Sequence, residues 1–316
     1  MKAFVAMLAA FLAIAPAPAR AGGIVRDVEY GRAPDGTRLL LDAHVPDGAG
    51  PFPVAILVHG GGWSGGDKSG SNRPGDTADI SPWFAPLSAA HFTWFSINYR
   101  LAPQHRWPAG LEDVETAVRW VKAHARDYRG DPGRIALIGH SAGGHLVCLA
   151  VTLADADTRV QAVVGFAPVT DLEADAAVRG GLSPSLQKLF DRPKEVAADT
   201  RALLRAASPI DHVHAGLPPF LLLHGDADQS VPYRQSLGFQ ERLRTAGVPC
   251  DLITIHGGPH GLVHWGEIAP GYPDALVAWL RAKLGAAPSR APRRRRVRRA
   301  IVAPACGSSA PGRAAS

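Results

Sequence analysis

Six short runs of continuous apolar residues are the strongest constraint on the fold of this chain. A strand is apolar throughout only where both faces of its sheet are covered, whereas a strand with one wet face alternates. Two earlier runs, Ile24–Tyr30 and Arg38–Val45, are joined through Pro34-Asp35-Gly36 and predict an antiparallel pair. The six later runs are Pro53–Val58, Phe92–Ile97, Arg134–Gly139, Val160–Phe166, Pro219–His224 and Asp251–His256.

Amphipathic helical patterns alternate with these runs. The clearest pattern, Gly110–His124, places apolar residues at spacings of three and four with acidic and basic residues on the other side, which indicates one buried stripe. This alternation predicts an α/β fold: a mostly parallel, doubly wound sheet whose ligands bind at the carboxyl ends of the strands. No repeat or linker divides residues 22–285, so we expect one domain there. The other predicted helices are Ala142–Ala154, Arg234–Ala246 and Pro273–Leu284.

The first 21 residues have the pattern of a secretory signal peptide. Lys2 precedes an uncharged apolar run, Ala3–Ala15, and Ala19-Arg20-Ala21 forms a small-residue cleavage site. The run is shorter than the roughly 20 residues that span a bilayer. We therefore expect cleavage after Ala21 and a secreted or periplasmic protein without stable membrane insertion; an uncleaved anchor is the alternative.

The net charge of +6 is concentrated at the other end of the chain. Residues 286–316 hold eight arginines and no acid, and the rest of the chain has 26 basic against 28 acidic residues. The body therefore gives no electrostatic indication of nucleic-acid binding. The tail is rich in Ala, Pro and Arg and is predicted to be disordered, either as a contact for polyanions or as a solvated extension.

Cysteine usage predicts neither a disulfide framework nor a metal site. Cys148 and Cys250 lie in apolar runs and are expected to be small core residues, and Cys306 lies in the tail. No C-x-x-C or H-E-x-x-H spacing is present, so we expect no metal and no cofactor.

The segment Gly139-His140-Ser141-Ala142-Gly143 places a serine between a predicted strand and a predicted helix. G-x-S-x-G at such a junction is a nucleophile elbow, in which small flanking residues permit a tight turn that raises the hydroxyl above the sheet edge. Ser141 is therefore the predicted nucleophile. His140 occupies the variable position of the motif.

A serine hydroxyl needs a base and an orienting acid, in the chain order Ser, Asp, His. His260 lies in a Gly-Pro loop after the last apolar run and is the predicted base. Asp226 and Asp228 both follow the preceding run and compete for the role of the acid. Asp228 is favoured because it lies further into the loop, whereas Asp226 is placed to cap the turn.

An oxyanion requires backbone N–H donors, each worth about 3 kcal/mol. The loop His59-Gly60-Gly61-Gly62-Trp63 follows a predicted strand and carries no obstructing side chains at its glycines. Gly61, Gly62 and Ala142, the residue after the nucleophile, are the predicted oxyanion donors.

Together these motifs resemble the α/β-hydrolase superfamily, and within it the carboxylesterases related to hormone-sensitive lipase. The resemblance covers nearly the whole body and assigns the catalytic positions to Ser141, Asp228 and His260. It implies a serine esterase that acts through an acyl-enzyme. The motifs are HGGGW (59–63), GGDKS (65–69), NYRLAP (98–103), GHSAGG (139–144), HGDADQSVP (224–232) and PHG (259–261).

Two departures narrow the resemblance. His140 replaces the acidic residue usual before the nucleophile, and HGGGW leads into GGDKS. Both are similar to the secreted bacterial acetylxylan- and feruloyl-esterase-like branch and to arylformamidases. Short-chain esters of polysaccharide, acetyl or feruloyl, are the expected substrates. Residues 170–208 correspond to a small cap and imply an open site, and Trp63 is either an acyl-pocket residue or an ordinary core or surface tryptophan.

Two other functions fit the same scaffold. An arylformamidase or prolyl-oligopeptidase-like enzyme would cleave amides, and a non-catalytic binding protein would use a silenced hydrolase fold. The full set of Ser141, Asp228, His260 and the glycine loop favours an enzyme.

Overall fold

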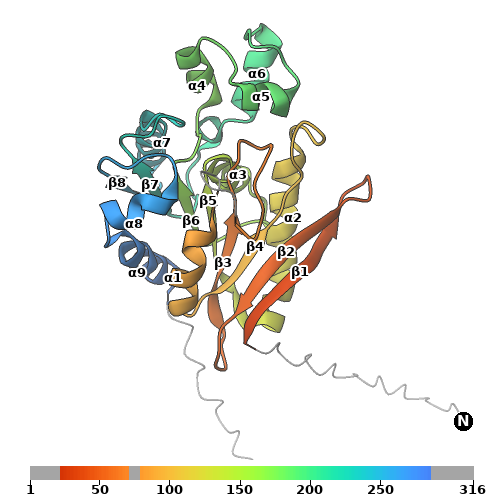
Figure 1. Ribbon diagram of the computed structural model, residues 1–316, viewed down its shortest axis with the longest axis vertical. Helices are drawn as coiled ribbons and strands as arrows, with labels where there is room; N and C mark the ends of the chain where they lie inside the picture. Colours follow the sequence, from red (N-terminus) through yellow and green to blue (C-terminus); the bar gives the residue numbers. More distant parts are fainter. Residues whose placement is uncertain (1–21, 71–78, 286–316) are drawn as a thin grey trace, which may run out of the picture. The chain divides into compact units, whose positions relative to one another are not determined.

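The computed structural model describes residues 22–70 and 79–285 (Figure 1). The predicted signal peptide, residues 1–21, and the predicted tail, residues 286–316, lie outside the described residues. The described residues form one compact unit.

One eight-stranded mixed sheet forms the centre of this unit, in the order β1-β2-β4-β3-β5-β6-β7-β8. The first two strands are antiparallel to each other, as predicted, and β2 is antiparallel to β4; every later pairing is parallel. All eight predicted runs are strands. Their bounds are β1 Gly23–Arg32, β2 Arg38–Val45, β3 Phe52–Val58, β4 Thr93–Ile97, β5 Gly130–His140, β6 Ala162–Phe166, β7 Phe220–Gly225 and β8 Cys250–Ile255.

Helices cover both faces of this sheet, which explains why the central strands are apolar throughout. Alternate residues of β3 point to opposite faces: Ile56 packs in one apolar cluster and Leu57 in the other. The first cluster contains residues of α2 (Ala109–His124), α3 (Ala142–Thr152) and α7 (Arg234–Thr245). The second contains residues of α1 (Phe84–Ala89), α8 (Trp265–Ile268) and α9 (Tyr272–Leu284). Short 3-10 segments complete the connections at Ser81–Trp83, Ala125–Tyr128, Pro209–His212 and Leu262–His264.

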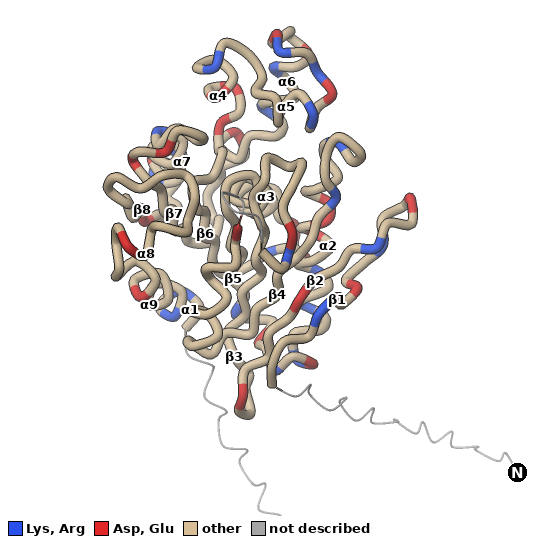
Figure 2. Tube along the Cα trace, viewed as in Figure 1, with Lys and Arg blue, Asp and Glu red and all other residues tan. Residues whose placement is uncertain are grey.

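The predicted cap consists of three short helices at the carboxyl end of the sheet: α4 (Leu172–Arg179), α5 (Pro184–Phe190) and α6 (Ala198–Ala206) (Figure 1). Leu172, Leu186 and Leu204 are buried in the same cluster as α2 and α3, so the cap is packed onto the body by apolar contacts. Acidic and basic residues are interspersed along the cap helices (Figure 2).

The sequence patterns did not predict α1 or α8, which are only 6 and 4 residues long. Helices of this length show too few turns for a 3.6-residue period to be recognised. Cys148 and Cys250 are both free and buried, as predicted. Among the described residues, no helix combines the length and the apolar character needed to cross a membrane.

Candidate active site

Ser141 lies in a strained turn between β5 and α3. Its backbone has φ 54° and ψ −118°, a left-handed conformation that costs a non-glycine residue about 1–3 kcal/mol. Two hydrogen bonds hold the turn: Ser141 N donates to Phe166 O (2.9 Å) and His145 N donates to Ser141 O (2.8 Å). The position after Ala142 must be glycine, because a Cβ on Gly143 would lie 2.3 Å from Val58 O. This is the geometry that the elbow motif predicts.

The predicted base and acid lie next to this serine. His260 Nε2 is 2.9 Å from Ser141 Oγ, and His260 Nδ1 is 2.7 Å from Asp228 Oδ2. The three residues follow β5, β7 and β8, whose parallel carboxyl ends meet at one edge of the sheet. The structure therefore brings the predicted nucleophile, base and acid into one continuous hydrogen-bonded series.

Asp228 is held by donors on both carboxylate oxygens. Its Oδ1 accepts from Ser230 N (2.7 Å) and Val231 N (2.8 Å), and its Oδ2 faces His260 and His224. Burial by itself raises the pKa of this carboxyl. The hydrogen bonds from the two histidines and from the backbone outweigh burial and hold the pKa well below its usual range, so Asp228 is ionised.

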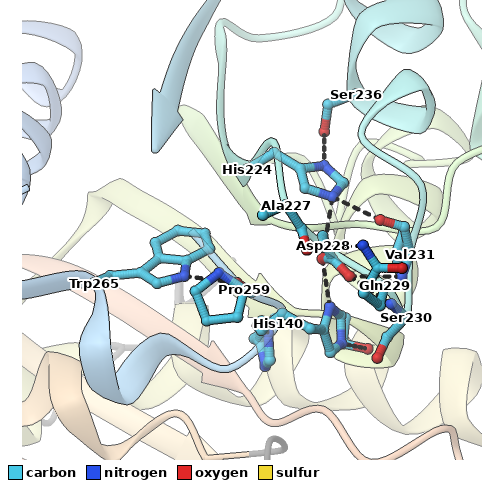
Figure 3. A network of polar contacts seen from close by, with 12 residues as sticks. His140, His224, Ala227, Asp228, Gln229, Ser230, Val231, Ser236, Pro259 and Trp265 are labelled. Carbon is cyan, nitrogen blue, oxygen red and sulfur yellow. Dashed lines mark hydrogen bonds and ion pairs between the residues drawn. The ribbon is translucent and has the colours of Figure 1, made fainter. Parts of the chain in front are cut away.

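Two contacts fix the loop that carries His260. Trp265 Nε1 donates to Pro259 O (2.8 Å), and His140 Nε2 donates to the carbonyl oxygen of His260 (3.0 Å). The rings of His140 and His260 lie with centroids 4.9 Å apart. Figure 3 shows His140, Pro259 and Trp265 in this arrangement. Burial lowers the pKa of His140 to about 3, so this ring is neutral.

The predicted oxyanion residues line the same cavity as the serine. Gly61, Gly62 and Ala142 are among the residues that surround it, together with Ser141 and His260. Gly61 has φ 103°, and a Cβ there would lie 2.3 Å from Gly65 O. The glycine loop thus follows a path that a side chain would block.

Two of the motifs that carried the resemblance, NYRLAP (98–103) and GGDKS (65–69), lie next to the glycine loop and form hydrogen bonds there. Ala102 N donates to Trp63 O (2.8 Å), and Tyr99 Oη donates to His59 O (3.2 Å). The side chain of Asn98 accepts from the backbone of Lys68 and donates to Asp67. The NYRLAP segment therefore holds the glycine loop in place, and its Asn98 also binds the GGDKS segment.

Trp63 is a buried residue that also lines the cavity over Ser141. Its side chain is buried, with 5% of the residue exposed, yet it lines the cavity beside Gly62. Trp63 Nε1 donates to His145 Nδ1 (3.1 Å), and His145 Nε2 donates to Ala207 O (2.7 Å). These bonds require a neutral His145, and burial lowers its pKa to about 4.

The cavity over Ser141 has a volume of about 480 Å³ and a polar wall on the cap side. Arg179 of α4 donates through Nε to both oxygens of Asp175 (2.9 Å each) and through Nη2 to Ser230 O. The guanidinium thus joins the cap to the loop that carries Asp228. The other polar residues around the cavity are Ser183, Ser185 and Gln229.

Four residues near the site were not predicted from the sequence: His140, treated as a variable position, and His145, His224 and Arg179. Three of them contact a segment distant in the chain: His140 bonds to His260, 120 positions away, His145 to Trp63, 82 positions away, and Arg179 to Ser230, 51 positions away. His224 instead bonds to Val231 and Ser236, 7 and 12 positions away. One signal was available for the histidines, because all three interrupt apolar runs where an imidazole is buried only with hydrogen-bond partners. Within residues 22–70 and 79–285, no group of three or more His, Cys, Asp or Glu side chains is arranged to hold a metal ion.

Curated proteins with similar sequences are esterases. The chain is 37% identical to Esterase LipQ of Mycobacterium tuberculosis over 234 residues, which cover 70% of this chain and 53% of that protein. It is 36% identical to the probable carboxylic ester hydrolase LipM of the same organism over 210 residues, covering 63% and 46%. The chain thus spans about half the length of these curated relatives.

Solved structures with the same fold are also esterases. A truncated carbohydrate esterase from gut microbiota has a TM-score of 0.67 and 25% identity, covering 85% of this chain and 99% of that one. Thermogutta terrifontis esterase 2 has a TM-score of 0.66 and 26% identity, covering 84% and 96%. The model of the BD-FAE family matches residues 41–243, more than half of the chain. The chain therefore belongs to the BD-FAE family and has the α/β-hydrolase fold of these esterases.

Proposed function

We propose that the protein is a serine carboxylesterase that cleaves short-chain esters through an acyl-enzyme. The observation that carries the proposal is the position of His260, whose two ring nitrogens lie 2.9 Å from Ser141 Oγ and 2.7 Å from Asp228 Oδ2. Membership of the BD-FAE family and the esterase relatives support the same activity.

In the acylation step, Ser141 Oγ attacks the ester carbonyl carbon while His260 Nε2 takes the hydroxyl proton. The carbonyl π electrons move to oxygen, and the N–H groups of Gly61, Gly62 and Ala142 are the proposed donors to that oxyanion. The tetrahedral intermediate then expels the alcohol, which receives the proton from His260. Asp228 stays ionised and stabilises the imidazolium.

In the deacylation step, water takes the place of the alcohol. His260 removes a proton from the water, hydroxide adds to the acyl carbonyl, and the C–O bond to Ser141 breaks. Ser141 Oγ regains its proton from His260, and the carboxylic acid leaves. All proton transfers pass through Nε2, because Nδ1 remains hydrogen-bonded to Asp228.

We propose esters of a hydroxyl-rich alcohol, such as acetyl or feruloyl groups on polysaccharide, as the substrates. The cavity is lined by an ion pair and serines of the cap and by the amide of Gln229 in the loop after β7, which suit sugar hydroxyls better than a lipid chain. A structural neighbour named as a carbohydrate esterase agrees with this substrate class. The signal-peptide pattern of residues 1–21 supports export to the compartment where such polymers occur.

The test is hydrolysis of p-nitrophenyl acetate by the full chain. We expect turnover that Ser141→Ala lowers by a factor on the order of 10⁴ or more, since the nucleophile is removed. Ser88→Ala, a serine of α1 whose hydroxyl binds Trp94, is the matched control and should keep wild-type turnover. Equal turnover by the Ser141 variant would contradict the proposal. Faster cleavage of N-formylkynurenine or a prolyl anilide than of any ester would favour an amidase instead.

A further inference from the structure

A second histidine faces the carboxylate of Asp228. His224 lies at the end of β7 and is completely buried. Its Nε2 is 3.3 Å from Asp228 Oδ2 and 3.0 Å from Val231 O, and its Nδ1 is 2.7 Å from Ser236 Oγ. Figure 3 shows His224 between Ser236 and Asp228, with a contact on each ring nitrogen.

The neighbours of His224 determine where its proton lies. Both groups that face Nε2, the Asp228 carboxylate and the Val231 carbonyl, are acceptors, so Nε2 carries a hydrogen. In the neutral ring, Nδ1 then accepts from the Ser236 hydroxyl. The single Nε2–H of His224 hydrogen-bonds to Val231 O (3.0 Å), and Asp228 Oδ2, the oxygen that accepts from His260 Nδ1, lies 3.3 Å from the same nitrogen.

Three hydrogen bonds reach the Asp228 carboxylate, and His224 Nε2 adds a fourth, longer contact at 3.3 Å. Ser230 N and Val231 N occupy Oδ1, while His260 and His224 share Oδ2. An ionised carboxylate offers about four lone-pair positions, so three are hydrogen-bonded and the fourth faces the His224 ring. A group held from all sides cannot rotate away from the base that it orients.

We propose that His224 is a positioning residue for the esterase reaction. It fixes the orientation of Asp228 and weakens the attraction between Asp228 Oδ2 and the proton on His260 Nδ1. This inference rests on the proposed function. A carboxylate oxygen shared between two donors stabilises each less than an unshared one. Without His224, His260 would hold its proton more tightly and act as base only at higher pH.

The other titratable groups around this pair are few. His140 packs against His260, Tyr233 meets His224 edge to face with ring centroids 5.5 Å apart, and Arg179 binds Ser230 O. His140 is neutral over the working range because burial lowers its pKa to about 3. The acid limb is the low-pH side of the plot of kcat against pH, where activity falls as the base is protonated. A change in this limb therefore reports on the Asp228–His260 pair.

The test compares His224→Phe with His224→Gln in the full chain. Phe keeps a ring and removes both nitrogens, whereas Gln can place an N–H near the position of Nε2. For His224→Phe we expect kcat for p-nitrophenyl acetate to fall about tenfold or more with KM changed less than about threefold. The midpoint of its acid limb should rise by about half a pH unit or more. Gln should restore most of both properties.

His256→Gln is the matched control, since His256 is an exposed histidine that pairs with Asp226. It should leave kcat and the acid limb at wild-type values. A folded His224→Phe variant with wild-type kcat and acid limb would overturn the proposal, as would a Gln variant as impaired as Phe. If the Phe variant does not fold, Ser236→Ala replaces it: a lower kcat supports the proposal, and wild-type kcat and acid limb contradict it.

Proton NMR separates this inference from the esterase proposal. The resonance of the His260 Nδ1–H and its titration midpoint can be followed without substrate. A shift of that midpoint in His224→Gln or Ser236→Ala smaller than in His224→Phe supports the role of His224 even if no ester is turned over. An identical midpoint in wild type and His224→Phe contradicts it whatever the activity.

Discussion

Asp226 and Asp228 lie two positions apart, yet their carboxylates bind different histidines. Asp226 accepts from His256 Nδ1 (2.8 Å) and from Gly257 N, at the exposed turn after β8. Asp228 is buried and accepts from His260. One loop therefore contains two Asp–His pairs of similar geometry, of which only the buried pair reaches Ser141.

These two pairs give a matched experiment at the residue scale. Asp228→Asn should lower kcat by a factor on the order of 10³–10⁴, because an amide stabilises the wrong imidazole tautomer and leaves the imidazolium without a counter-charge. Asp226→Asn should keep kcat within about threefold of wild type. Steady-state kinetics with p-nitrophenyl acetate decides; a larger loss in Asp226→Asn would transfer the acid role to Asp226.

The order of residues predicted the Ser141–His260 contact, whereas the choice of Asp228 over Asp226 rested mainly on the family resemblance. Each residue follows a recognisable apolar run, and the ends of parallel strands meet at one edge whatever the details of packing. The partners of His140, His145 and His224 could not be predicted in the same way. Their contacts depend on side-chain directions: those of His140 and His145 join elements that are far apart in the chain, and those of His224 depend on how the loop between β7 and α7 folds back.

At the scale of elements, α4 supplies the Asp175–Arg179 ion pair that lines the cavity. Asp175 and Arg179 are one turn apart on its inner side, and the guanidinium spans to Ser230 O. The sequence predicted a cap at residues 170–208, and the helices were found there. It did not indicate which cap residues face the cavity, because Ala, Arg and Pro recur throughout the segment.

Arg179→Lys should weaken the binding of hydroxyl-rich substrates more than the binding of p-nitrophenyl acetate. A lysine is a single point charge and cannot bind Asp175 and Ser230 together as the guanidinium fork does. We expect KM for acetylated xylo-oligosaccharides to rise about tenfold, whereas KM for p-nitrophenyl acetate, which has fewer groups to bind, changes less than about threefold.

The control for this substitution is Arg201→Lys. Arg201 of α6 pairs with Glu173 and lines a separate cavity of the cap. Its replacement should leave both KM values unchanged. Equal effects of Arg179→Lys on the two substrates would show that α4 does not discriminate between them.

At the scale of the whole molecule, buried histidines couple folding to pH. Burial lowers the pKa of His140 to about 3 and that of His145 to about 4, against about 6.5 in an unfolded chain. Both rings are neutral in the folded protein, so their full contribution to the free energy of unfolding is present above pH 6.5. As the pH falls below 6.5, the unfolded chain binds protons that the folded protein does not, and stability is lost.

The expected slope is about 1.4 kcal/mol per pH unit for each of the two histidines, between pH 6.5 and the folded pKa values. Urea unfolding at pH 8, 7, 6, 5 and 4 measures it. Asp228, whose pKa is lowered by its hydrogen bonds despite burial, adds a loss in the same direction near the acid end. His256→Gln, which alters an exposed ring, should leave the slope unchanged. A free energy of unfolding that stays constant from pH 7 to pH 4 would contradict neutral burial of these rings.

The central claim, that Ser141 is the nucleophile of a serine esterase, is tested most directly by covalent labelling. The full chain is incubated with a fluorophosphonate probe and the modified peptide is identified by mass spectrometry. We predict one adduct on Ser141, with loss of p-nitrophenyl acetate hydrolysis in proportion to labelling, and no adduct in Ser141→Ala. An unlabelled Ser141, or an adduct on Ser185 or Ser230 in the same cavity instead, would contradict the account.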